Sequence, residues 1–194
     1  MKYSLFIATI SIGIFSACNS NNNNNNAATK TASDSTPTKT TAPAPATTTK
    51  ATPVKDVLTG YLQLKNALAN DNGSDAAAAG KSMETAFHQF DKSALTPDQK
   101  KLYEDVEDDA REHAEHIGKN GSNIKHQREH FDLLSKDMFE LVKTFGAGQS
   151  LYQDSCPMYN DGKGATWLSE KKEIENPYYG KKMPTCGSVK LELQ

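Results

Sequence analysis

Four successive segments between residues 54 and 145 carry apolar residues at three- and four-residue spacing, and this repeated pattern restricts the fold more than any other feature. The spacing predicts amphipathic α-helices, each with one apolar stripe facing a common core. The connections between them are short, which favours an up-down four-helix bundle and a mainly α fold. The predicted helices cover approximately residues 54–69, 74–90, 96–118 and 123–145.

Boundary signals support this division of the chain. Thr96, Pro97 and Gln99 provide an N-cap, a proline in the first turn and a glutamine placed for a capping box. Gly146 would end the last helix. After it, turn residues alternate with short apolar runs, so we predict an irregular loop region over 151–194 with a few short antiparallel strands. The apolar runs lie at residues 150–152, 165–168 and 188–193.

The first 18 residues resemble a bacterial lipoprotein signal peptide. Lys2 supplies a positive charge, residues 5–15 form an apolar run too short to span a bilayer, and Cys18 follows two small residues. Cleavage would leave Cys18 as a lipid-bearing N-terminus. The alternative is an ordinary secretory peptide in which Cys18 has no role. Lipidation predicts a protein anchored to a bacterial membrane, the outer membrane in our interpretation, and facing the periplasm.

Residues 19–53 have no apolar periodicity. An asparagine run at 21–26 is followed by Thr, Ala, Pro, Lys and Ser, a composition that cannot bury enough surface to offset its chain entropy. We predict a disordered tether. The remaining residues, 54–194, suit one domain. The formal net charge of −2 gives no reason to expect a nucleic-acid partner.

The C-terminal region contains the other two cysteines, each with a methionine nearby. Cys156 is followed by Met158, and Cys186 is preceded by Met183. Thiolate and thioether sulfurs are soft ligands that favour Cu(I), and the turns between the two pairs would let the segment fold back. The four sulfurs therefore indicate a metal site. In an exported protein, a structural disulfide is an equal alternative, and unpaired thiols are a third.

All five histidines fall in predicted helices. His113 and His116 are three residues apart, and His126 and His130 are four apart, so the members of each pair can meet on a helix surface. Neutral imidazole suits copper, zinc or nickel. His113 falls within its apolar stripe and is interpreted as a core histidine, whereas the default for the others is a solvated position. His130 joins the candidate metal ligands because its helix leads into the Cys156 loop.

Catalytic signatures are missing from the sequence. It contains no GxSxG nucleophile elbow, glycine-rich phosphate loop, HExxH or CxxC motif. A nucleophilic pair of Cys156 and His130 would be unfavourable in an oxidising compartment beside a second cysteine. We therefore expect a protein that is not an enzyme.

Residues 126–143 (HQREHFDLLSKDMFELVK) and 151–187 resemble an uncharacterised bacterial domain family of exported proteins and lipoproteins. The same domain also occurs attached to periplasmic adaptor subunits of copper and silver efflux systems. The resemblance extends from about residue 54 to the C-terminus and implies an efflux-linked heavy-metal role, but no established biochemical activity. The family pattern matches Arg128, His130, Phe131, Cys156, Pro157, Met158, Gly164, Trp167, Leu168, Asn176, Pro177, Tyr178, Gly180, Met183, Cys186 and Gly187.

Together these observations predict a lipid-anchored periplasmic protein that binds copper and takes part in metal efflux or homeostasis. Its partner would be an efflux adaptor or another envelope protein. The alternative is an interaction module without a metal, in which a disulfide shapes a docking loop. In the first interpretation Cu(I) would be held by Cys156, Met158, Met183 and Cys186, with His130 as a further ligand.

Overall fold

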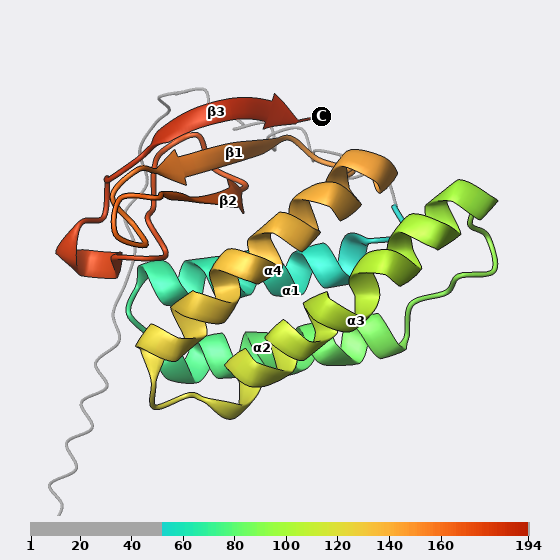
Figure 1. Ribbon diagram of the computed structural model, residues 1–194, viewed down its shortest axis with the longest axis horizontal. Coiled ribbons are helices and arrows are strands. Elements are labelled where there is room, and N and C mark those ends of the chain that lie inside the picture. Colours follow the sequence, from blue (N-terminus) through green and yellow to red (C-terminus); the bar gives the residue numbers. More distant parts are fainter. Residues whose placement is uncertain (1–51, 194) are drawn as a thin grey trace, which may run out of the picture. The chain divides into compact units, whose positions relative to one another are not determined.

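The computed structural model describes residues 52–193, which form four helices followed by a three-stranded sheet (Figure 1). The predicted mainly α fold is confirmed. The predicted signal peptide, the lipidated Cys18 and most of the predicted tether lie outside the described residues. The elements are α1 (Lys55–Ala69), α2 (Gly73–His88), α3 (Pro97–Lys119), α4 (Ile124–Phe145), β1 (Leu151–Cys156), β2 (Ala165–Ser169), the 3-10 helix η1 (Gly180–Lys182) and β3 (Ser188–Leu193).

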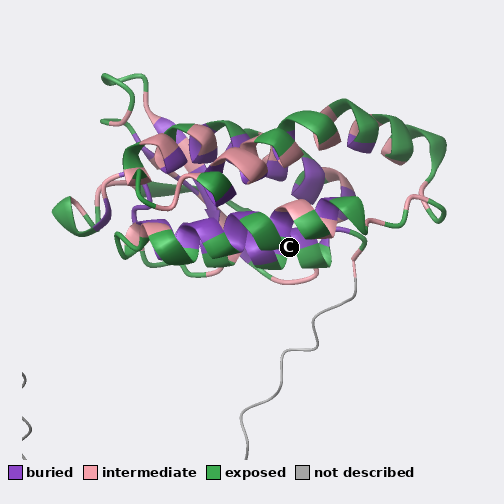
Figure 2. Ribbon diagram, turned by 90° about the horizontal axis from the view of Figure 1, so that it is seen from below, coloured by how far each residue is buried: buried purple, intermediate pink, exposed green. Residues whose placement is uncertain are grey.

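The helices pack in chain order around one apolar core. Each helix contacts the next, and α1 also contacts α4, as an up-down bundle requires. Figure 2 shows buried residues on the helix faces that meet inside the bundle and exposed residues on the outer faces. The apolar stripes predicted from the sequence therefore form the core. Its large side chains include Tyr61, Leu64, Tyr103, Phe131 and Leu134, all fully buried.

Small residues allow α2 and α3 to approach closely. A Cβ at Gly80 would lie 2.7 Å from the carbonyl oxygen of Ala114, and a Cβ at Gly118 would lie 3.0 Å from Lys81 Cγ. Substitution at Gly80 would push the helices apart because its neighbour is backbone. The predicted capping box on Thr96 is present at the start of α3. The glycines therefore set the close spacing of α2 and α3, and the capping box sets where α3 begins.

The sheet has the order β2-β1-β3, with both pairs antiparallel. β2 contacts α4 and α1, which places the sheet on one side of the bundle (Figure 1). β1 is longer than predicted: it continues to Cys156, which stands opposite Ala165 in β2. Within residues 52–193, no helix combines the length and the hydrophobicity that a membrane span requires.

Candidate metal site

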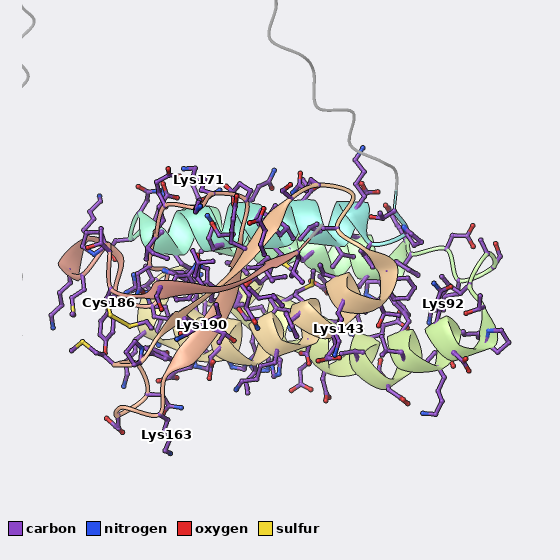
Figure 3. The ribbon with its side chains drawn as sticks, turned by 90° about the horizontal axis from the view of Figure 1, so that it is seen from above. Lys92, Lys143, Lys163, Lys171, Cys186 and Lys190 are labelled. Atoms are coloured by element: carbon purple, nitrogen blue, oxygen red, sulfur yellow. A yellow bond between two sulfur atoms is a disulfide. The ribbon has the colours of Figure 1, made fainter. Side chains whose placement is uncertain are left out.

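The two cysteines of the C-terminal region form a disulfide, and their Cα atoms are 5.7 Å apart. Cys156 is fully buried at the end of β1, whereas Cys186 is partly exposed just before β3 (Figure 3). Of the states predicted for these cysteines, the structure has the disulfide. Neither sulfur is a thiolate in this state, so the four-sulfur metal site is not formed.

The two methionines of the predicted sulfur site differ in environment. Met158 is 53% exposed, and its carbonyl oxygen accepts a hydrogen bond from the Tyr179 hydroxyl at 2.8 Å. Met183 is partly buried after η1, and its carbonyl oxygen accepts a hydrogen bond from the Cys186 amide at 3.2 Å. Copper binding by these four sulfurs stays a prediction, and it concerns the reduced protein.

Arg128 on α4 ties the C-terminal loop to the bundle. Its Nε donates to the Pro177 carbonyl at 2.7 Å, and its Nη2 donates to the Leu68 carbonyl at 2.9 Å and to Asp71 at 2.6 Å. Asp71 also accepts the Lys181 amide, and its pKa is lowered chiefly by the hydrogen bond from Arg128. The predicted folding-back of the loop therefore rests on a charged network as well as on turns.

The loop also has its own internal supports. Asn176 is buried, and its Nδ2 donates to the Cys186 carbonyl at 2.6 Å. The Tyr178 hydroxyl donates to the Thr166 carbonyl at 2.6 Å, and the Tyr178 ring packs edge-on against Trp167 with centroids 5.8 Å apart. These residues, several of which carry the family resemblance, stabilise the loop.

Four histidines from α3 and α4 gather on the bundle surface. His116, His126 and His130 each offer a ring nitrogen within 4.8 Å of the others. The His130 ring stacks on His116 with centroids 4.4 Å apart and meets His126 nearly perpendicularly at 4.5 Å. His113 Nδ1 lies 3.1 Å from His130 Nδ1. All four side chains are partly exposed, so an ion could reach them from solvent.

Two polar side chains fix the helix junction at which these rings lie. Asn123 caps α4 by accepting a hydrogen bond from the His126 amide at 3.2 Å. Gln127 is fully buried, and its Nε2 donates to the carbonyls of Gly73 at 2.9 Å and Ile117 at 3.1 Å. Gln127 thereby holds the start of α4 against the ends of two neighbouring helices. One-turn spacing on α3 and α4 then brings both histidine pairs to this junction.

His130 is held in its neutral form at neutral pH. Burial, and then the charges of His116, His126 and His113, lower its pKa to about 4. Burial also lowers the pKa of His113. A neutral imidazole offers a lone pair to a metal ion, and an imidazolium does not. The environment of His130 therefore matches what a metal ligand needs.

Two carboxylates lie beside the imidazoles. Glu112 Oε1 is 3.8 Å from His116 Nε2, and Glu129 Oε2 is 3.5 Å from His126 Nδ1. Carboxylates next to ligating histidines orient the rings and raise their basicity. Their negative charge also favours a bound cation over an empty cluster.

The three rings would have to move closer to bind one ion. Nitrogens on a tetrahedral ion with bonds of about 2.0–2.1 Å lie roughly 3.3 Å apart. The present separations of up to 4.8 Å must therefore shorten by as much as about 1.5 Å. Because the side chains are partly exposed, rotation about their χ angles can supply this movement without repacking the core.

Only one of these four histidines was predicted to bind a metal, and it was predicted as a ligand of a different site. The sequence interpretation assigns His130 to the sulfur site, His113 to the core and His116 and His126 to the solvated surface. The structure instead brings all four together, and His113 is only partly buried. The signal that could have revealed this is the occurrence of two one-turn histidine pairs on consecutive, antiparallel helices.

A second unusual polar group lies in the sheet. Asp154 on β1 is fully buried, and neither carboxylate oxygen has a hydrogen-bond partner among residues 52–193. Burial raises its pKa to about 7, against an opposing effect of the Lys65 charge. Lys65, itself fully buried, pairs with Glu170 at 3.0 Å and with Glu175 at 3.6 Å. Asp154 therefore makes stability depend on pH.

A family model described as a protein of unknown function (DUF3347) matches residues 57–150. The match begins in α1 and ends just before β1, so it includes all four clustered histidines but not the disulfide loop. Neither a curated protein nor a solved structure matches the chain. The link to efflux adaptors is therefore carried by the sequence resemblance alone. Through its helical bundle, the chain is therefore similar to the DUF3347 family of proteins of unknown function.

Proposed function

We propose that this protein binds a transition-metal ion, with copper as the metal, through His116, His126 and His130. The observation that carries the proposal is the convergence of three partly exposed ring nitrogens within 4.8 Å. Imidazole suits zinc, copper and nickel, and copper stands highest in the affinity order of the divalent first-row ions. The neutral state of His130 at neutral pH supports the same conclusion.

The nitrogen ligands change the expected oxidation state. Cys156 and Cys186 are joined, so the soft thiolates that would select Cu(I) are not formed. Three imidazoles are a borderline donor set that accepts Cu(II) or Zn(II). We therefore propose Cu(II) for the oxidised protein and keep the sulfur site as a proposal for the reduced one.

The cellular role that we propose is metal buffering or transfer, not catalysis. The lipoprotein-like N-terminus favours a lipid-anchored protein that faces the periplasm, and the family resemblance favours an efflux adaptor as the partner. Partial exposure of the three histidines supports transfer, because a partner's ligands could replace them one at a time.

Competitive titration of the purified, oxidised protein with Cu(II) against a chromophoric chelator tests the proposal. We expect one equivalent to bind to the wild type and to His88→Ala, a matched control on the exposed end of α2. His126→Ala and His130→Ala should bind at least about tenfold more weakly. Equal affinity in all four proteins would contradict the proposal.

A second candidate function is docking, and the formed disulfide favours it. A groove next to the loop is lined by Leu133, Met158, Tyr159 and Tyr179, of which Leu133 is 44% exposed. Co-elution of the metal-free protein with a purified efflux adaptor, lost in Leu133→Asp, would support this function. Co-elution only with the metal-loaded protein would favour metal transfer.

A further inference from the structure

We propose that His113 is the positioning residue of the metal site, because its Nδ1 accepts the Nδ1 proton of His130 and thereby leaves the Nε2 lone pair of His130 free for the ion. This inference rests on the proposed function. It adds a residue outside the three ligands and fixes which nitrogen of His130 binds.

The contact between the two rings is a direct hydrogen bond. The two Nδ1 atoms are 3.1 Å apart, and the rings are inclined by 55° with centroids 5.3 Å apart. His113 stands one turn before His116 on α3, and His130 stands one turn after His126 on α4. The bond therefore crosses the helix interface directly beside the three candidate ligands.

Proton counting decides which ring donates when the metal is bound. Between two neutral imidazoles that face each other through Nδ1, only one Nδ1 can carry the proton. If His113 donates, His130 keeps its own proton on Nε2 and has no lone pair for an ion. If His130 donates, its Nε2 is unprotonated and can bind. Metal binding at His130 Nε2 therefore requires His113 to be the acceptor.

The surroundings of His113 agree with an accepting role. Its Nδ1 is engaged with His130, and His113 is not one of the three residues whose ligand atoms converge. The negative charges of Glu112 and Asp109 act on its ring. When His113 accepts through Nδ1, its own proton lies on Nε2, so the ring is the neutral tautomer that this hydrogen bond requires. The arrangement is that of a partner which fixes the tautomer of a ligating histidine.

Two variants of His113 separate positioning from packing. His113→Leu fills the same space with an apolar side chain but removes the Nδ1 acceptor. His113→Asn places an amide oxygen close to the position of Nδ1 and keeps an acceptor. We expect Zn(II) to bind His113→Leu about 10–100-fold more weakly than the wild type, and His113→Asn to recover most of that loss. Thermal unfolding of both metal-free variants shows whether each one folds.

Long-range ¹H–¹⁵N correlation spectra provide a readout that packing alone would not change. In the Zn(II)-loaded wild type and His113→Asn, His130 should carry its proton on Nδ1 and the metal on Nε2. Metal bound through His130 Nδ1 would overturn the inference, as would a His113→Leu variant with wild-type affinity. If the wild type binds neither Zn(II) nor Cu(II), the proposed function and the role of His113 both fail. If the wild type binds metal but the His113 results differ from those expected, only the role of His113 fails.

Discussion

Asp71 accepts a 2.6 Å hydrogen bond from Arg128, which joins the turn after α1 to the helix that carries His126 and His130. The same guanidinium donates to the carbonyls of Leu68 and Pro177. A single side chain thus links the first helix, the last helix and the disulfide loop. This link sets the position of the loop relative to the candidate metal site.

Replacing Arg128 with Met should destabilise the protein. The substitution leaves two carbonyls and one carboxylate without their charged donor, and the expected loss is about 2–4 kcal/mol of unfolding free energy. Urea unfolding followed by circular dichroism measures it. Lys100→Met is the control, because its pair with Glu104 is half exposed and should contribute less than about 1 kcal/mol. Equal losses in both variants would show that Arg128 does not hold the loop.

Gly180→Ala should disrupt the same link sterically. Gly180 has φ +54°, and a Cβ there would overlap the Asp71 carboxylate and lie 2.6 Å from Arg128 Nη2. Gly162→Ala is a matched control, since Gly162 has φ +81° but no atom within 4 Å of the added carbon. Both variants should lose about 1 kcal/mol for the positive φ, and Gly180→Ala about 1–3 kcal/mol more. Chemical denaturation of the two proteins gives the difference, and no difference would refute the steric account.

Reduction of the disulfide should destabilise the fold but leave the histidine site intact. The bond joins residues 30 positions apart, which corresponds to about 3–4 kcal/mol in the chain-entropy model. Unfolding of the oxidised wild type and of a Cys156→Ala/Cys186→Ala variant measures that difference. The variant should bind Cu(II) with wild-type affinity. Loss of binding in the folded variant would contradict this prediction and show that the histidine site depends on the disulfide.

Asp154 should make the protein less stable as pH rises. Its pKa is about 7 in the folded protein and near 3.8 when unfolded. Between these values the folded state binds a proton that the unfolded state has lost, so stability is full below about pH 4 and falls until about pH 7. The loss has an upper bound of about 4 kcal/mol.

The variant Asp154→Asn should remove this dependence and be more stable than the wild type at pH 8. Unfolding free energies of the two proteins at pH 5 and pH 8 provide the test. The difference between them isolates Asp154, because Asp137, whose pKa burial raises to about 6, contributes equally to both. A stability difference that does not change between the two pH values would contradict the account.

The helices were predictable from the sequence because their stabilising contacts follow a local rule. One-turn apolar spacing, the Thr96 capping box and Gly146 define the elements without knowledge of partners. The ends of the strands were less predictable. β1 extends to Cys156 because β2 and β3 pair with it, and such pairing is not visible in the segment itself.

The candidate site was predictable only in part, because its residues come from two helices. The spacing of His126 and His130 is visible in the sequence, whereas the stacking of His130 on His116 depends on how α3 and α4 face each other. The cysteines had two equally good chemical interpretations. Only the position of Cys186 beside the end of β1 decides between them, and long-range contacts set that position.

X-ray absorption spectroscopy of the copper-loaded, oxidised protein tests the central claim most directly. The account predicts a first shell of nitrogen or oxygen at about 2.0 Å with the outer-shell scattering of imidazole rings, reduced in His126→Ala. A shell of sulfur at about 2.3 Å, or a spectrum without imidazole scattering, would contradict a histidine site formed by α3 and α4.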